Sequence, residues 1–124
     1  MEFPTDLKYS ENHAWVKVDD DIAKIGITEY AAEQLGEIVF IDLPEEGETI
    51  EVGESFTEIE SSKTSSEVPS PVSGEIIAVN FELDDDPELI NDDAFAAWIV
   101  EIKLEDESEI EDLLDARAYE EICD

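Results

Sequence analysis

Residues 58–74 have the sequence Glu-Ile-Glu-Ser-Ser-Lys-Thr-Ser-Ser-Glu-Val-Pro-Ser-Pro-Val-Ser-Gly, which places Lys63 among small hydroxyl side chains. Apolar residues that favour strands, Ile59 and Val68, lie on the two sides of this polar centre. The pattern predicts two strands joined by an exposed turn, with Lys63 at its tip. A primary amine held on such a turn suits the covalent attachment of a carrier group. An ordinary solvated lysine is the alternative interpretation.

The composition predicts one domain over residues 1–124, because a chain of this length that is 42% hydrophobic can bury one modest core. The charge is strongly acidic, since 37 Asp and Glu residues against 6 Lys and Arg residues give a net charge of −31. Such a surface repels nucleic acid and anionic membranes, and it favours partners with cationic surfaces or a salty cell interior.

Two features concern where the protein works. The chain has no apolar run long enough to cross a bilayer, and it does not start with a basic segment followed by an apolar one. Its single cysteine, Cys123, excludes an internal disulfide framework and fits a reducing compartment. We therefore expect a cytoplasmic protein.

The first third of the chain predicts a hairpin followed by a short helix. Residues 15–18 and 22–27 contain alternating strand-forming residues on the two sides of an acidic turn. Thr28 is a suitable N-cap and Gly36 a suitable left-handed stop, so residues 29–35 should form a short helix.

The middle of the chain predicts further strands. Residues 37–44 are nearly all apolar, which predicts a strand buried on both faces at the centre of the fold. Shorter strands are expected at residues 49–52 and 75–80. Pro69 and Pro71 cannot donate to a sheet ladder, so the second arm of the Lys63 hairpin should be an edge or bent segment there.

Residues 84–91 form an acidic segment, Asp-Asp-Asp-Pro-Glu-Leu-Ile-Asn, that predicts one helical turn. In this interpretation Asp86 is the cap and Pro87 occupies the first helical position. A calcium loop is excluded because the glycine at the sixth position and the distal bidentate glutamate are missing.

The two ends of the chain complete the expected pattern. Residues 98–104 alternate as the final strand, and residues 108–111, Ser-Glu-Ile-Glu, have the form of a capping box. The capping box and the apolar spacing that follows predict an amphipathic C-terminal helix over 108–122, with Asp115 able to recap it and break it in two. Residues 1–6 are expected to be frayed.

Six or seven short strands with helices only at the margins predict a mainly β fold. We expect a small β-sandwich or flattened barrel with a short internal helix and a C-terminal helix.

The Lys63 segment resembles the lipoylation hairpin of the glycine cleavage system H protein family. The resemblance rests on Glu-Ser-Ser-Lys at 60–63, Ser-Glu-Val at 66–68 and Ser-Pro-Val-Ser-Gly-Glu-Ile at 70–76. It extends over roughly residues 7 to 122, through His13-Ala14-Trp15, the segments Gly-Ile-Thr-Glu and Leu-Gly-Glu-Ile-Val-Phe-Ile-Asp-Leu-Pro, and the helical tail from Leu113 to Glu120. The Asp-Lys-Ala of 2-oxo acid dehydrogenase carriers and the Met-Lys-Met of biotinyl carriers do not occur.

The resemblance implies a barrel-sandwich hybrid, like the lipoyl and biotinyl carriers, with lipoate joined covalently to Lys63. It further implies a non-enzymatic, monomeric carrier of the aminomethyl group of glycine, without catalytic or metal-binding residues. The implied partners are the decarboxylating glycine dehydrogenase, the aminomethyltransferase, dihydrolipoyl dehydrogenase and a lipoate-attaching enzyme. Neither nucleic acid nor membrane is expected as a partner.

The chain departs from the family pattern at three places: Ala14 replaces an acid, Pro69 replaces a larger side chain, and the segment 94–97 lacks a proline, a hydroxyl and one residue. In the family, the acid before the tryptophan helps to line the cleft that shelters the loaded arm. Ala14 cannot do so, and we expect weaker shelter unless Glu11 or Glu67 substitutes.

Enzymatic interpretations have little support, because His13 lacks ligand partners at suitable spacing and Cys123 lies among acids that raise a thiol pKa. Two other functions stay open. One is an H-like lipoate carrier that serves another pathway, such as sulfur transfer. The other is an acidic interaction module in which Lys63 is never modified.

Overall fold

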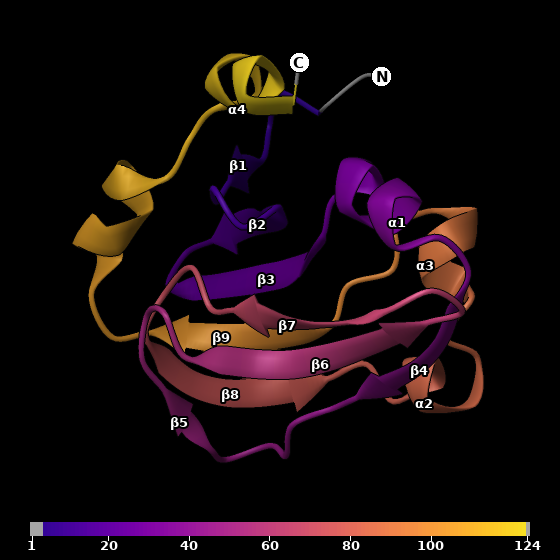
Figure 1. The fold of residues 1–124 in the computed structure, drawn as a ribbon. Coiled ribbons are helices and arrows are strands. Elements are labelled where there is room, and N and C mark those ends of the chain that lie inside the picture. The colour runs from indigo at the N-terminus through magenta and orange to yellow at the C-terminus, as the bar shows by residue number, and fades with distance from the viewer. Residues whose placement is uncertain (1–3, 124) are drawn as a thin grey trace.

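A computed structural model describes residues 4–123, and Met1–Phe3 and Asp124 lie outside it (Figure 1). Its strands are β1 (Lys8–Tyr9), β2 (Ala14–Asp19), β3 (Ile22–Ile27), β4 (Ile38–Asp42), β5 (Thr49–Ile50), β6 (Ser55–Ser61), β7 (Ser65–Pro69), β8 (Gly74–Val79) and β9 (Val100–Leu104). Its helices are α1 (Glu29–Leu35), α2 (Glu82–Asp85), α3 (Leu89–Asp92), the 3-10 helix η1 (Glu107–Asp112) and α4 (Ala116–Cys123).

The strands form two antiparallel sheets, which confirms the predicted mainly β fold. The larger sheet has the order β1-β2-β3-β9-β8-β5, and the smaller one has the order β4-β6-β7. Their inner faces bury one apolar core, whose most deeply buried members include Val16, Ile25, Ile59, Ile76, Ile99 and Ile102. Five of these side chains lie on the inward faces of their strands, as the alternation of apolar residues requires, and Ile99 directly precedes β9.

A second, smaller cluster lies on the other face of the large sheet. It contains Tyr9 and Trp15 from β1 and β2, and Tyr119 from α4. Figure 1 shows α4 next to β1, beyond which β2 follows in the large sheet. The C-terminal helix therefore covers the strands that lead into the first hairpin.

The prediction for residues 37–44 is wrong in its burial. β4 is an edge strand of the small sheet, and Val39 and Phe40 are 51% and 45% exposed. The register shifts between Ile38 and Phe40 where β4 pairs with β6, so a bulge turns two consecutive side chains outward. Only Ile38 and Ile41 enter the core.

The acidic segment 84–91 also differs from the expectation of one capped turn. Two short helices, α2 and α3, lie there, and Asp86 ends the first instead of capping the second. The α3 helix begins at Leu89, two residues beyond Pro87. The sequence interpretation gave weight to the many carboxylates of this segment and not to its apolar residues. Leu83 and Ile90 are buried and fix the two helices against the core.

The C-terminal helix is divided, as the alternative with Asp115 allowed. The first part is the 3-10 helix η1, whose N-cap is Asp106, so the predicted capping box at 108–111 is wrong. Glu109 instead accepts hydrogen bonds from the backbone N–H and the hydroxyl of Ser73, at 2.7 and 2.9 Å. Asp115 restarts the helix by accepting from the Ala118 N–H at 2.8 Å.

This division changes which side chains of the tail are buried. Ala116 and Tyr119 face the sheet, whereas Ile122 is 44% exposed, although a continuous amphipathic helix over 108–122 would place it on the apolar side. Because the helix is interrupted at residues 113–115, α4 presents a different set of side chains to the sheet than a continuous helix would.

Two further expectations concern the edge of the small sheet and the start of the chain. β7 is an edge strand that ends at Pro69, as the two prolines predicted. Residues 4–6 are not frayed, since the hydroxyl of Tyr9 donates to the Pro4 carbonyl at 2.6 Å. The rest of the predicted frayed start lies outside the described residues.

Candidate functional site

The β6–β7 hairpin places Lys63 at its exposed tip. Across the turn, the Ser61 N–H donates to the Thr64 carbonyl at 2.7 Å. The Ser61 hydroxyl oxygen also accepts from the N–H groups of Lys63 and Thr64, at 3.2 and 3.1 Å. One small side chain thus fixes the backbone that carries the lysine.

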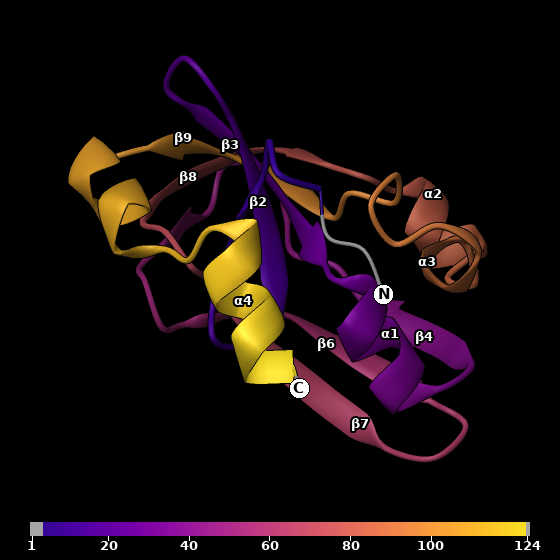
Figure 2. The same cartoon turned by 90° about the horizontal axis from the view of Figure 1, so that it is seen from above.

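The tip of the hairpin also contacts the segment between α1 and β4. The Ser62 N–H donates to the Glu37 carbonyl at 2.9 Å, and the Lys63 side chain lies across Gly36. Figure 2 shows this β6–β7 connection projecting at the side of the fold that carries α1 and β4.

A groove lies beside the hairpin, between α1 and β7, with a volume of about 140 Å³. Its walls are formed by Asn12, His13, Ile27, Ala31, Gln34, Leu35, Ser66, Glu67 and Val68. The β7 residues follow Lys63 by three to five positions, which is about 10–17 Å along an extended strand. The groove has space for roughly five water molecules.

Glu67 is the acid that lines this groove. Ala14 lies in the core with no exposed surface, and Glu11 lines a different hollow beside η1. Of the two substitutes that the sequence left open, the geometry therefore favours Glu67.

A buried hydrogen-bond chain supports the other wall of the groove. The hydroxyl of Tyr119 lies 2.6 Å from His13 Nδ1 and 2.7 Å from Thr28 Oγ1. Thr28 also caps α1 by accepting from the Ala31 N–H at 3.2 Å. When the imidazole is neutral with its proton on Nε2, Thr28 donates to Tyr119 and Tyr119 donates to His13.

This chain fixes His13 in a structural position. Its backbone has φ 68°, in the left-handed region, and its ring packs against Tyr30 at 5.0 Å between centroids. Burial lowers the pKa of His13 and raises the pKa of Tyr119. Both groups are therefore held in their uncharged forms near neutral pH.

The unusual segment 94–97 closes over the tryptophan of the first hairpin. The indole N–H of Trp15 donates to the Ala94 carbonyl at 3.0 Å, and the rings of Phe95 and Trp15 lie 6.5 Å apart. A tight turn allows this approach, since Ala96 and Ala97 both donate to the Asp93 carbonyl, at 3.1 and 3.0 Å. The shorter segment thus packs without a proline.

The comparisons with known proteins agree with this geometry. The family model described as Glycine cleavage H-protein matches residues 7–124. The chain belongs to the glycine cleavage H-protein family. It is 51% identical over 123 residues to the glycine cleavage system H protein of Staphylococcus carnosus, and 50% identical over 123 residues to that of Bacteroides thetaiotaomicron. In both comparisons, 98% of each chain is covered.

A solved structure is also similar. The crystal structure of a glycine cleavage system H protein from Mycobacterium marinum has a TM-score of 0.87 and 38% sequence identity, and the match covers 94% of this chain and 95% of that one. Its likeness supports the lipoyl-type hybrid barrel that the resemblance implied.

Membership in the H-protein family establishes the class of function. The protein is a carrier of the glycine cleavage system and not an enzyme, and the family carries covalently attached lipoate. The other components of that system are its partners by family membership.

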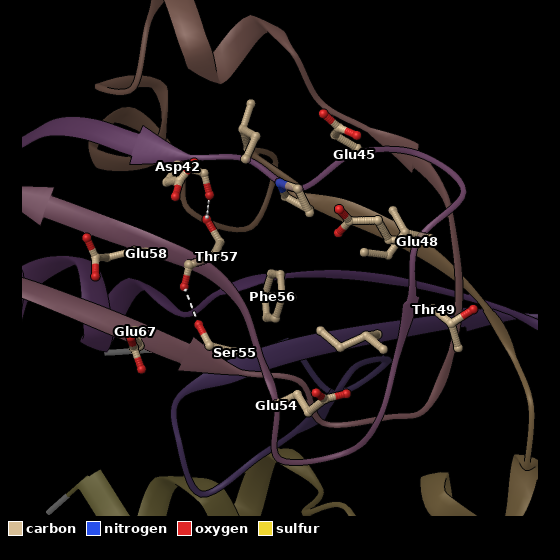
Figure 3. A pocket seen from close by; sticks show the side chains of 14 residues that line it. Asp42, Glu45, Glu48, Thr49, Glu54, Ser55, Phe56, Thr57, Glu58 and Glu67 are labelled. Carbon is tan, nitrogen blue, oxygen red and sulfur yellow. Dashed lines mark hydrogen bonds between the residues drawn. The ribbon is translucent and has the colours of Figure 1, made fainter.

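A larger hollow lies toward the open end of the β6–β7 hairpin (Figure 3). It has a volume of about 590 Å³, with Phe56 on its floor. Six carboxylates line it, from Asp42, Glu45, Glu48, Glu54, Glu58 and Glu67. The hydroxyl of Thr57, which also lines this hollow, donates to the Asp42 carbonyl at 2.7 Å.

Residues 4–123 contain neither a metal-binding cluster nor a membrane-spanning helix. No group of three or more His, Cys, Asp or Glu side chains among residues 4–123 could hold a metal ion. Within the same residues, no helix has the length and apolar character needed to cross a bilayer.

The sequence missed two features of the site. Tyr119 contacts His13 although 106 positions separate them, and no local pattern indicates that contact. The contact between the Lys63 side chain and Gly36 was also missed, because Gly36 was interpreted only as a helix stop. The glycine itself was the available signal, since it marks either a left-handed turn or a close approach.

Proposed function

We propose that Lys63 is the residue that carries lipoate, in amide linkage to Nζ, and that this chain moves the aminomethyl group of glycine between the enzymes of the glycine cleavage system. The observation that carries the proposal is an exposed primary amine at the tip of a hairpin in an H-protein fold. The matched hairpin sequence points to the same residue.

The residues around Lys63 fit a lipoyl group. The neighbours at the tip are small hydroxyl residues, which leave room for another protein to close over the amine. The groove beside β7 combines apolar walls from Ile27, Leu35 and Val68 with the carboxylate of Glu67. Such a lining suits an arm with an apolar body and a cationic end.

The chain supplies attachment, reach and shelter. When bound, lipoate supplies a dithiolane that takes up the one-carbon unit reductively and is reoxidised by thiol exchange. The hairpin holds the anchor still, so that only the arm moves. The apolar walls of the groove would cover the body of the arm, and Glu67 would hold a cationic amine by a charge-assisted hydrogen bond.

The proposed partners are the decarboxylating glycine dehydrogenase, the aminomethyltransferase and dihydrolipoyl dehydrogenase, with a lipoate-attaching enzyme that loads Lys63. A net charge of −31 supports docking to cationic surfaces and opposes binding to nucleic acid, to membranes and to a second copy. We therefore propose a monomer in which residues 1–124 act as one carrier domain. A cytoplasmic location is part of the proposal, supported by a single cysteine.

Substitution of Lys63 tests the proposal. Lys63→Arg keeps the positive charge and removes the acylatable amine. We expect intact mass spectrometry to find no lipoate on the variant after incubation with the attaching enzyme, and turnover in the reconstituted cycle to vanish.

Lys8→Arg is the matched control, because Lys8 is also exposed but lies on β1. It should load and turn over as the unsubstituted protein does. Lipoate on the Lys63→Arg protein would assign the attachment to another lysine. A native protein whose mass shows no lipoate would instead favour the unmodified interaction module.

A further inference from the structure

We propose that the C-terminal end of α1 is a seat for the unmodified Lys63 side chain, and that Gly36 is the positioning residue that leaves room for it. The seat presents the amine in a fixed place before acylation and releases the arm afterwards. The release rests on the proposed lipoylation of Lys63, whereas the seat itself does not.

The contact between Gly36 and Lys63 is the central observation. A Cβ atom built on Gly36 would lie 2.8 Å from Cε of Lys63 and 3.4 Å from its Nζ. The first distance is closer than real Cβ atoms approach other atoms, so any other residue would displace the lysine. The end of the Lys63 side chain, although exposed to solvent, therefore lies against the backbone of Gly36.

The backbone at Gly36 independently requires glycine. Its φ of 84° and ψ of −148° lie close to a region that essentially only glycine occupies. Its N–H donates to the Ala32 carbonyl at 3.0 Å and ends α1. The turn that ends the helix thus also creates the flat surface on which the lysine lies.

The seat is rigid because its backbone is bonded on two sides. The side-chain amide of Asn91 in α3 donates to the Gly36 carbonyl at 2.8 Å and accepts from the Ile38 N–H at 2.9 Å. From the hairpin, Ser62 donates to Glu37 at 2.9 Å. Asn91 and Ser62 therefore fix the positions of α1, α3 and the hairpin tip relative to one another.

The electrostatic surroundings favour a cation at this place. The last carbonyl groups of a helix lack intrahelical partners and carry partial negative charge. Glu37 follows Gly36 directly in the chain, and Asp92 follows Asn91, whose side chain binds the Gly36 carbonyl. An ammonium group seated on Gly36 is attracted by both.

Acylation removes that attraction. Amide formation joins Nζ to the carbonyl carbon of an activated lipoyl donor, expels the activating group with its electron pair, and releases two protons from the former ammonium. The product is a neutral amide that also bears a bulky acyl chain. It has neither the charge nor the size for the seat, so the arm becomes free to swing.

Lysine side-chain relaxation in solution tests the seat on the unmodified protein. With 13C-labelled lysine, we expect Cε of Lys63 to be more restricted than Cε of Lys8, and to become as mobile as Lys8 in Gly36→Ala. Gly53→Ala is the matched control, because Gly53 has a similar φ of 92° but nothing within 4 Å of an added Cβ. It also adds a methyl group at a positive φ but away from Lys63, so it should leave Lys63 restricted.

A second measurement follows loading. The attaching enzyme should modify Gly36→Ala roughly two- to fivefold more slowly than Gly53→Ala, which corresponds to the typical contribution of a cation at a helix C-terminus. If Gly36→Ala does not fold, Asn91→Asp replaces it, since that variant keeps an acceptor for Ile38 but loses the donor to Gly36.

The outcomes separate the two proposals. Equal mobility of Lys63 and Lys8 in the unsubstituted protein would overturn the seat, as would a restricted Lys63 in Gly36→Ala. A restricted Lys63 that the attaching enzyme never modifies would leave the seat standing and refute its role in loading. Loss of restriction on lipoylation would support the release.

Discussion

Single side chains decide how this carrier holds and shelters its arm. Lys63 is one of six cations in a chain with 37 acids, and its position at the tip of a small-residue turn distinguished it from the other lysines. The sequence alone therefore led to the proposal that Lys63 is the anchor. It could not decide which acid faces the arm, because that choice depends on how β7 packs against α1. The structure selects Glu67 for that wall.

The first prediction concerns Glu67. Glu67→Gln removes one negative charge from the groove, so the loaded protein should lose its cationic aminomethyl group faster, by about fivefold, or on the order of 1 kcal/mol for one partly exposed charged hydrogen bond. Glu11→Gln removes the same charge from a different hollow and should not change the loss rate. Mass spectrometry over time measures both. Equal rates for the two variants would show that Glu67 does not hold the load.

The second prediction concerns His13. Burial lowers its pKa below the ordinary value of 6.5, so as pH falls below about 6.5 the unfolded chain gains a proton that the folded protein does not. His13 therefore costs stability on acidification, by at most about 1.4 kcal/mol per pH unit, until the pH reaches its folded pKa. Above pH 6.5 this loss is absent.

The test compares urea unfolding of the native protein with that of His13→Asn, because asparagine tolerates the left-handed backbone at φ 68°. Carboxylate titration is common to both proteins and cancels in the difference. The native protein should lose stability relative to the variant between pH 7.5 and 5.5. Parallel pH profiles would mean that His13 does not titrate differently in the two states.

Local patterns in the sequence predicted helices and strands where neighbouring residues decide them. The α1 helix has the predicted bounds, since its N-cap and its glycine stop both lie in the local sequence. The burial of β4 was not predictable, because a bulge depends on the partner strand. The capping box at Ser108 failed for a similar reason: the nearby Asp106 caps the helix, and Glu109 binds Ser73.

The third prediction tests the pairing of β8 with β9. Gly74 stands opposite Leu104 in this pair, and a Cβ there would overlap the Lys103 carbonyl oxygen. Gly74→Ala must therefore push the two strands apart, at a cost of about 3 kcal/mol or more. Gly47→Ala is the control, since its added methyl meets nothing within 4 Å and its cost should be limited to backbone strain, about 1 kcal/mol. Urea denaturation midpoints that fall equally for both would contradict the steric argument.

The charge of the protein acts over its full surface, and the few cations are not spread to balance it. Lys24 and Lys103 pair across strands with Glu101 and Glu75 on the outer face of the large sheet, and Lys24 also lies 5.6 Å from the Trp98 ring centroid. These lysines neutralise their own neighbours. Most carboxylates therefore repel one another without a nearby cation, which favours the unfolded chain at low ionic strength.

The last prediction follows from this repulsion. The screening length falls from about 10 Å at 0.1 M salt to about 3 Å at 1 M, so the melting temperature of the unloaded protein should rise as potassium chloride increases. Each kcal/mol of relieved repulsion corresponds to roughly 4 °C. The double variant Glu45→Gln/Glu46→Gln removes two exposed carboxylates from a loop, and it should melt higher at low salt and respond less to added salt. The same screening should weaken docking to cationic partner enzymes, so stability and docking respond to salt in opposite directions. A melting temperature that falls steadily from low to molar potassium chloride would refute the argument from repulsion.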